Sequence, residues 1–231
     1  QKWILNGEAK LDEVSRLVAK KVADIPEEKL VPPEPYIAVP ALQAISYSMD
    51  SEELRNMYAG LLSKAINSDE KDRVHPAYVE IIRQMSPLDA KALEFIQQGG
   101  RSAVALCNIR WQKKSTPSWN GFQYIRLEGY GRYLYRNLIR AYEEGKDAID
   151  ITVSFENLDR LGLVKIWDDR QIDRESYRDF EESDMVSSFL LSTKNRPDAS
   201  ENEVALLPGA AEITALGRAF SRICLPKPVS K

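Results

Sequence analysis

The sequence predicts a mainly α-helical protein with a small β component. The first hundred residues carry apolar side chains at the three- and four-residue spacing of amphipathic helices. Residues 149–222 alternate short helical and strand-like segments, which is typical of a winged helix-turn-helix. We therefore expect an N-terminal helical array over residues 1–85. A divergent winged helix-turn-helix domain follows over residues 86–231, with a large basic, aromatic insertion at residues 101–148.

The composition agrees with a globular chain. Of the 231 residues, 43% are hydrophobic and 29% are charged, with a net charge of −3, so the chain is long and apolar enough to bury a core. No run of 18 apolar residues is present, which argues against a spanning helix. Cys107 and Cys224 do not form a disulfide framework, which favours a cytoplasmic location. The chain begins at Gln1 rather than at methionine, so we expect a trimmed N-terminus.

The N-terminal array is predicted from spacing and capping. Residues 8–23 have helical periodicity, and the proline-dense residues 25–40 predict a surface connector. Residues 41–47 predict a short buried helix. The next helix is expected over residues 51–67, capped by Asp50 or Ser51.

Two further helices are predicted because a proline stands where each would begin, and proline fits the first position of a helix. His75-Pro76 opens one of them, and Ser86-Pro87 opens the next, with Ser86 as N-cap. The pair Gly99-Gly100 stops the second helix. We expect residues 87–97 to be the first helix of the winged domain.

The middle of the chain differs in composition. Residues 101–142 contain many arginines, lysines, tyrosines and tryptophans and a single acid, Glu128. Residues 111–121 are expected to form a loop, and residues 131–144 are expected to form a helix that Gly145 ends.

The C-terminal third predicts the remaining elements of the winged domain. Gly162 is expected to end a short helix, and Thr214 to cap a final helix that runs to Arg222. Residues 185–192 are consistent with either a helix or a strand. Within residues 149–161 we expect a short helix that Thr152 or Ser154 caps. The other expectations are strands over 163–167, 204–207 and 211–213, and loops over the acidic residues 168–184 and over 194–203.

The basic, aromatic segment is the best candidate for a functional surface. Lysine and arginine neutralise phosphates, and aromatic faces stack on unpaired bases. The alternative is that the aromatic residues are core and that the arginines pair with the acids of residues 168–184. In a winged helix-turn-helix, one helix enters the major groove of DNA. The outward positions of that helix would here include Glu156 and Asp159, whose negative charges repel phosphates, so the sequence argues against DNA binding by the winged domain. The candidate nucleic-acid-binding residues are Arg110, Trp111, Lys113, Lys114, Arg132 and Arg136.

No pattern in the sequence predicts catalysis. His75 is the single histidine, and we interpret it as part of a helix start rather than as a base. The acids of residues 168–173 and 181–184 lack EF-hand spacing and are interpreted as a solvated loop, although a cryptic nuclease using Asp168 is the enzymatic alternative. The Gly-Tyr-Gly sequence at residues 129–131 is interpreted as a turn. We expect no catalytic residue, no cofactor and no metal.

Several longer strings resemble one bacterial family. They include SEELRNMYAGLLSKAIN at residues 51–67, VHPAYVEIIRQMSPLDAKAL at 74–93, FENLDRLGLV at 155–164 and ITALGRAF at 213–220. Together they resemble the abortive-infection alpha (Abi-alpha) family. The resemblance implies a role in bacterial defence against phage but supplies no active site. It also implies that members carry further N-terminal sequence before the point where this chain starts.

The expected function is therefore that of a non-enzymatic phage-defence protein acting through protein or nucleic-acid contacts. One alternative is a nucleic-acid-binding module that uses residues 101–142. Another is a membrane effector that acts through an N-terminal segment missing from this chain. The expected partners are an unknown protein or a second copy of the chain, possible nucleic acid, and a membrane only through that missing segment.

Overall fold

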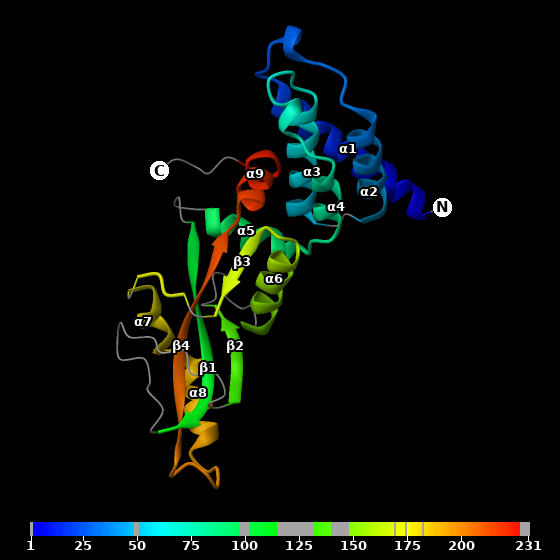
Figure 1. The fold of residues 1–231 in the computed structure, drawn as a ribbon. Coiled ribbons are helices and arrows are strands. Elements are labelled where there is room, and N and C mark those ends of the chain that lie inside the picture. Colours follow the sequence, from blue (N-terminus) through cyan, green and yellow to red (C-terminus); the bar gives the residue numbers. More distant parts are fainter. Residues whose placement is uncertain are drawn as a thin grey trace. The chain divides into compact units, whose positions relative to one another are not determined.

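The chain forms two compact units in a computed structural model (Figure 1). The helical unit comprises residues 1–99, 160–163 and 214–231, and the sheet unit comprises residues 100–159 and 164–213. The structure describes residues 2–48, 51–97, 102–114, 132–139, 148–168, 170–173, 175–181 and 183–226. Within these ranges no helix is long and apolar enough to cross a membrane.

The helical unit contains six of the described α-helices and two short 3-10 turns. The helices predicted around residues 8–23, 51–67, 75–85 and 87–97 are confirmed, as is the final helix. The elements are α1 (Lys2–Val22), η1 (Glu27–Lys29), α2 (Pro35–Ser48), α3 (Glu52–Ala65), η2 (Lys71–Arg73), α4 (Ala77–Arg83), α5 (Pro87–Gln97) and α9 (Ala215–Cys224).

Local hydrogen bonds explain why α3, α4 and α5 start where the sequence predicts. The Ser51 hydroxyl accepts from the N–H of Leu54 and caps α3. Before α5, the N–H of Asp89 donates to the Ser86 hydroxyl, and the Ser86 N–H donates to the Asp89 carboxylate. This reciprocal pair is a capping box, which satisfies helix donors without help from the rest of the fold. His75 has the expected role, because its Nδ1 accepts from the N–H of Ala77 at 3.1 Å.

The core of the helical unit lies around α3, which packs against α1, α2, α4, α5 and α9. Tyr58 and Leu61 of α3 are completely buried. Gly60 lies against the end of α9 so closely that an added Cβ would come within 2.8 Å of the Cys224 carbonyl oxygen. Glycine is therefore needed here for close helix contact rather than for backbone freedom.

Helix α2 is longer than predicted. The sequence favoured a connector through Pro40 because proline lacks an N–H, yet α2 begins at Pro35 and contains Pro40. Proline fits the first turn of a helix, so Pro35 starts it. The interior Pro40 is tolerated because Ile37, Ala41 and Ile45 bury one side of the helix, and this tertiary packing outweighs the lost hydrogen bond.

The sheet unit is built on an antiparallel sheet with the strand order β2-β1-β4-β3. Its two long central strands pair continuously from Ala103↔Glu212 to Lys113↔Asn202. The elements are β1 (Ala103–Lys113), β2 (Arg132–Leu138), α6 (Ala148–Arg160), β3 (Val164–Trp167), α7 (Glu175–Glu181), α8 (Asp184–Thr193) and β4 (Asn202–Ile213).

This sheet makes the described protein mixed α/β rather than mainly α, with nine α-helices and four strands among the described residues. The helix expected over residues 131–144 is wrong for its described part, because Arg132–Leu138 is strand β2. The beginning of the expected loop at 111–121 is likewise the end of β1. The expected loop and helix also include residues 115–121, 131 and 140–144, which lie outside the described residues. The Gly-Tyr-Gly sequence at residues 129–131 lies outside them as well.

The strands predicted for the winged domain form only part of this sheet. The strands expected at residues 163–167 and 211–213 do pair, with Val164 opposite Ile213. They belong to a larger sheet, however, because the supposed insertion supplies β1 and β2, and the strands expected at 204–207 and 211–213 are one strand. The winged helix-turn-helix is thus not what the described residues show.

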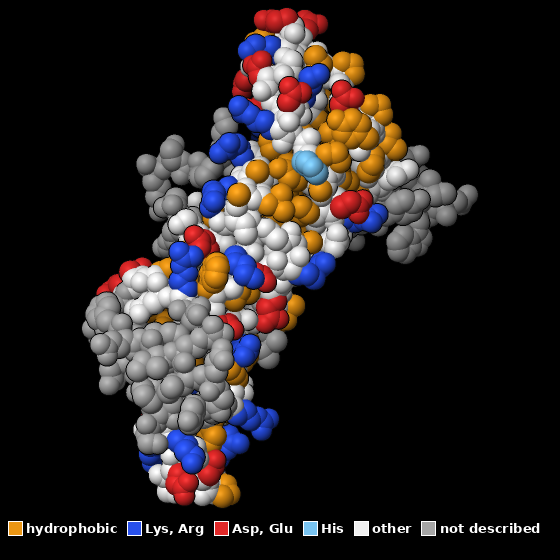
Figure 2. Space-filling view, viewed as in Figure 1, with side chains coloured by type: hydrophobic (Ala, Val, Ile, Leu, Met, Phe, Trp, Pro, Cys, Tyr) orange, Lys and Arg blue, Asp and Glu red, His pale blue; other side chains and the backbone are white. Residues whose placement is uncertain are grey.

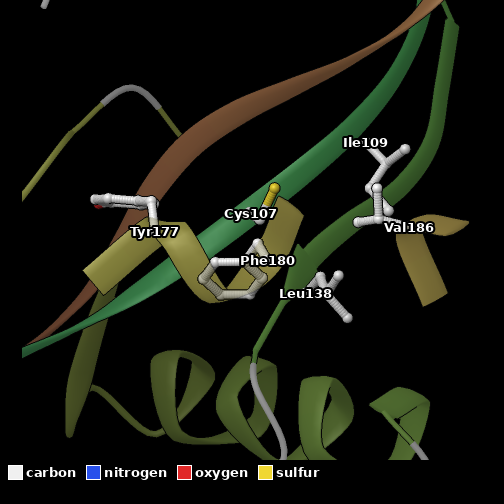
Figure 3. Close-up of a cluster of buried hydrophobic side chains, with 6 residues drawn as sticks. All are labelled: Cys107, Ile109, Leu138, Tyr177, Phe180 and Val186. Atoms are coloured by element: carbon white, nitrogen blue, oxygen red, sulfur yellow. The ribbon is translucent and has the colours of Figure 1, made fainter. Parts of the chain in front are cut away.

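Two helices of the sheet unit cover one face of the sheet. Cys107 and Ile109 of β1 form a buried cluster with Tyr177 and Phe180 of α7 and Val186 of α8 (Figure 3). Helix α7 lies within the stretch expected to be an acidic loop, and its Tyr177 and Phe180 explain why it folds onto the sheet. Residues 185–192, which the sequence left undecided, lie in α8, which Ser183 caps.

Candidate nucleic-acid interface

All six predicted nucleic-acid-binding residues lie on or next to the neighbouring strands β1 and β2. In the antiparallel register, Arg110 is opposite Tyr133 and Trp111 is opposite Arg132. Strand pairing therefore brings together basic residues that lie more than twenty positions apart in the sequence. It does not give them a common exposed surface, because alternate residues of a strand point to opposite faces.

The two residues at the centre of the predicted set are buried. Arg110 is 7% exposed and Trp111 is 8% exposed. The indole N–H of Trp111 donates to the Asp198 carboxylate at 2.8 Å, and the Arg196 guanidinium lies 5.3 Å from the centre of its ring. The ring expected to stack on a base thus already packs within the sheet unit.

Two more of the predicted cations have partners within the sheet unit. Lys114 donates to the carbonyl oxygen of Ser200 at 2.9 Å. Arg136 lies 3.6 Å from a carboxylate oxygen of Asp168 and stacks on Tyr133. The pairing of Arg136 with Asp168 is the neutralisation between the basic segment and the acidic stretch that the sequence left open.

Lys113 and Arg132 are the predicted cations that remain available. Both side chains are exposed, and neither has an ion-pair partner among the described residues. Each lies at an end of its strand, beyond the buried part of the sheet. Two exposed cations make a smaller phosphate-binding surface than the six that the composition suggested.

A row of buried polar side chains was missed by sequence reasoning. Asn108, Arg110 and Gln112 alternate along β1 and are 1%, 7% and 0% exposed. The Arg110 Nε donates to the Gln112 Oε1 at 3.0 Å, and the Gln112 Nε2 lies 3.5 Å from a carboxylate oxygen of Glu203. The signal was present, because polar residues alternate here with Cys107, Ile109 and Trp111, as in a two-faced strand.

The buried polar side chains of β1 connect to Asn137 of β2, where the backbone of that strand is irregular. Asn137 has a φ of 55°, which is uncommon for a residue other than glycine, and its N–H donates to the Asn108 Oδ1 at 2.8 Å. Its own Nδ2 donates to Glu156 of α6, and its carbonyl accepts from the Thr152 hydroxyl. The Asn108 Nδ2 and the Asn137 Oδ1 are buried without a hydrogen-bond partner. Polar contacts therefore fix the shift in register between β1 and β2.

The described acids of the acidic stretch are not grouped as metal ligands. Asp173 lies at the start of α7, where it accepts from the N–H and the hydroxyl of Ser176, and these hydrogen bonds lower its pKa. Asp169 and Glu182 lie outside the described residues. Across the described ranges, no three or more His, Cys, Asp or Glu side chains are arranged to hold a metal ion.

Comparison with known proteins gives the family but no structural precedent. No curated protein and no solved structure matches the chain. The sequence model described as abortive infection alpha matches residues 6–224, which is nearly the whole chain and includes both units. The resemblance found in the sequence is confirmed, and the chain belongs to the abortive infection alpha family.

Proposed function

We propose that this protein acts in defence against phage, without catalysis and in the cytoplasm, by making contacts with other proteins. The observation that carries the proposal is the family match over residues 6–224, because the family is named for abortive infection, a form of defence against phage. The match includes the helical unit and the sheet unit alike, so the proposed role belongs to the chain and not to one isolated module.

The surface of the helical unit supports a role for protein contacts. Helix α2 contains no charged residue, and it exposes Tyr36, Val39 and Leu42 by 59%, 51% and 46%. These residues are three positions apart, so they share one side of the helix. Figure 2 shows hydrophobic side chains gathered around His75 on the face of this unit in view. Contiguous exposed apolar side chains mark interaction sites more often than scattered ones do.

Plaque counts on bacteria that carry or lack the full-length gene test the defence role. We expect fewer plaques with the gene across at least part of a broad phage panel, and an unchanged count across the whole panel would contradict the proposal. The double variant Y36E/V39E should restore plaques, since it places charge on the apolar side of α2. Val153→Glu is the matched control, because Val153 is equally exposed at 57% but lies on α6.

Nucleic-acid contact is the second candidate, and exposed Lys113 and Arg132 favour it. Fluorescence anisotropy with a labelled 20-nucleotide single strand at low salt tests it. The double variant K113E/R132E should abolish binding that weakens with salt, because both phosphate-neutralising charges are reversed. Arg83→Glu is the control, since Arg83 is an exposed cation of the helical unit. An absence of binding by the unmodified chain would dismiss this candidate.

A further inference from the structure

The exposed side of α2 is symmetric about its central residue. Val39 is 51% exposed, and Tyr36 and Leu42, three positions before and after it, are 59% and 46% exposed. Pro35 and Gln43, about one turn to either side of Val39, are exposed as well. At about 100° per residue, all of these positions fall within about 60° of Val39 around the helix axis, so they form one continuous face.

This face carries no charge, and its surroundings favour neither sign. None of the 14 residues of α2 is charged. Helices α1, α3 and α4 pack against α2, and each of them carries charged residues of both signs. The surface therefore offers no electrostatic complement to an acidic or a basic partner. It also differs from a helix that binds anionic membranes, because such a helix carries lysine or arginine on its polar side.

A second copy of the same face is its geometric complement. When two identical helices pair antiparallel about a two-fold axis at Val39, positions equally far before and after Val39 lie opposite each other. Val39 then meets its own copy, and Tyr36 meets Leu42 of the second copy. Glu34, the exposed residue before α2, comes opposite Ala44 rather than another charge. Pairing of two copies thus buries apolar side chains without bringing like charges together.

The size of this face determines how strongly two copies should bind. It presents five side chains per copy, whereas a standard protein interface contains about 20–30 residues on each side. A contact of this size belongs to the small, transient class of interfaces. We therefore expect reversible pairing with a Kd of micromolar or weaker rather than a permanent dimer.

We propose that two copies of this chain pair through the exposed sides of their α2 helices, antiparallel, with Val39 on the two-fold axis. Tyr36 of each copy is the main apolar contact, since aromatic residues are enriched at the centre of interfaces. The inference rests on the proposed function in one respect, because it names a second copy as the partner of the α2 surface. It does not depend on the defence role, because pairing is measured on the purified chain.

Sedimentation equilibrium of the 231-residue chain between about 5 and 500 µM tests this proposal. The mean mass should rise with concentration from that of one chain toward that of two. Val39→Glu and Val39→Lys should each weaken pairing at least tenfold, because each places two like charges together at the axis. An equimolar mixture of the two variants should pair again, since a negative side chain then lies opposite a positive one. Only pairing of the face with itself predicts this recovery.

Val153→Glu is the matched control, because Val153 is 57% exposed but lies on α6, and it should leave the pairing unchanged. Circular dichroism establishes that the variants fold. A chain that stays monomeric at every concentration would overturn the proposal, as would a mixture of the two Val39 variants that pairs no better than either variant alone.

Failure of this inference can be told apart from failure of the proposed function. If the chain is monomeric while Y36E/V39E restores plaques, the α2 surface binds a different protein, so the inference is wrong and the proposed function stands. If the chain pairs as described while the gene leaves plaque counts unchanged, the inference stands and the defence role is contradicted.

Discussion

The helical unit and the sheet unit bury different kinds of side chain. Among the described residues, the buried polar side chains of the helical unit are Ser63, Asp89 and Ser221. The sheet unit buries more of them, and they include longer side chains: Asn108, Arg110, Gln112, Asn137, Thr152, Ser154 and Thr193. Apolar spacing and local caps thus specify the first unit, whereas polar contacts between distant segments specify part of the second.

The largest expected effect concerns the close contact in the helical unit. Gly60→Ala places a Cβ 2.8 Å and 3.0 Å from the backbone oxygens of Cys224 and Ile223, so α9 must move. We expect a loss of about 2–3 kcal/mol in the free energy of unfolding, measured by denaturant titration. Lys64→Ala, at a half-exposed position of α3, should cost less than about 0.5 kcal/mol. A cost for Gly60→Ala no greater than that of the control would contradict the close packing.

The polar row of the sheet unit should be nearly as sensitive. Arg110→Ala leaves the buried Gln112 amide oxygen without its donor, and we expect a loss of about 2 kcal/mol in the same measurement. The double variant R110M/Q112M removes both partners and should recover most of that loss, because no buried acceptor is stranded. Arg132→Ala, an exposed position on β2, serves as the control. If the loss for the double variant equals the sum of the losses for the two single variants, Arg110 and Gln112 contribute to stability independently, which would contradict this prediction.

A smaller effect is expected where α7 meets the sheet. The Tyr177 hydroxyl donates to the Gly209 carbonyl at 2.8 Å and accepts from the N–H of Ile172, and burial raises the pKa of Tyr177. Tyr177→Phe should cost about 1–1.5 kcal/mol of unfolding free energy. It should also increase amide exchange in α7 more than in the helical unit. Uniform exchange across both units would show that this bond does not anchor α7 locally.

The smallest effect is a pH dependence at the start of α3. The Ser51 hydroxyl donates to the Glu53 carboxylate at 2.7 Å and lowers the pKa of Glu53. A lowered carboxylate pKa stabilises the fold at neutral pH, and this contribution is lost as the pH falls below about 4.3, the usual glutamate value. Ser51→Ala should cost about 1 kcal/mol at pH 7 through the lost cap. Its difference from the unmodified chain should shrink on acidification, as followed by thermal unfolding between pH 3 and 7.

The contrast between the units also explains how far the sequence could predict the fold. The caps at Ser51, Ser86 and Thr214 were predictable because each is satisfied within a few residues. Strand β2 was not, because Tyr135, Ile139 and Tyr142 follow a helical spacing in the sequence, whereas the strand depends on Ile109, which lies 26 positions from its partner Tyr135. The preference of such a segment for a strand comes from the surface on which it packs.

The candidate site shows the same limit. Sequence composition singled out the basic segment as a candidate, and strand pairing places parts of that segment in two neighbouring strands. The composition could not reveal that Arg110 and Trp111 are buried, since burial depends on which face of β1 each side chain occupies and on what covers that face. Nor could it identify the order β2-β1-β4-β3, because that order exists only in the folded sheet.

The sequence by itself determined the family, the starts of α3, α4, α5 and α9, and the strand character of residues 163–167, 204–207 and 211–213. These features depend on near neighbours along the chain and on residue strings that the family shares. Only the tertiary structure decided that the basic segment contributes two strands to the sheet, that Arg110 and Trp111 are buried, and that β4 pairs with β1 along its length but with β3 at Ala210–Ile213. Those outcomes depend on contacts between residues far apart in sequence, which no local spacing encodes.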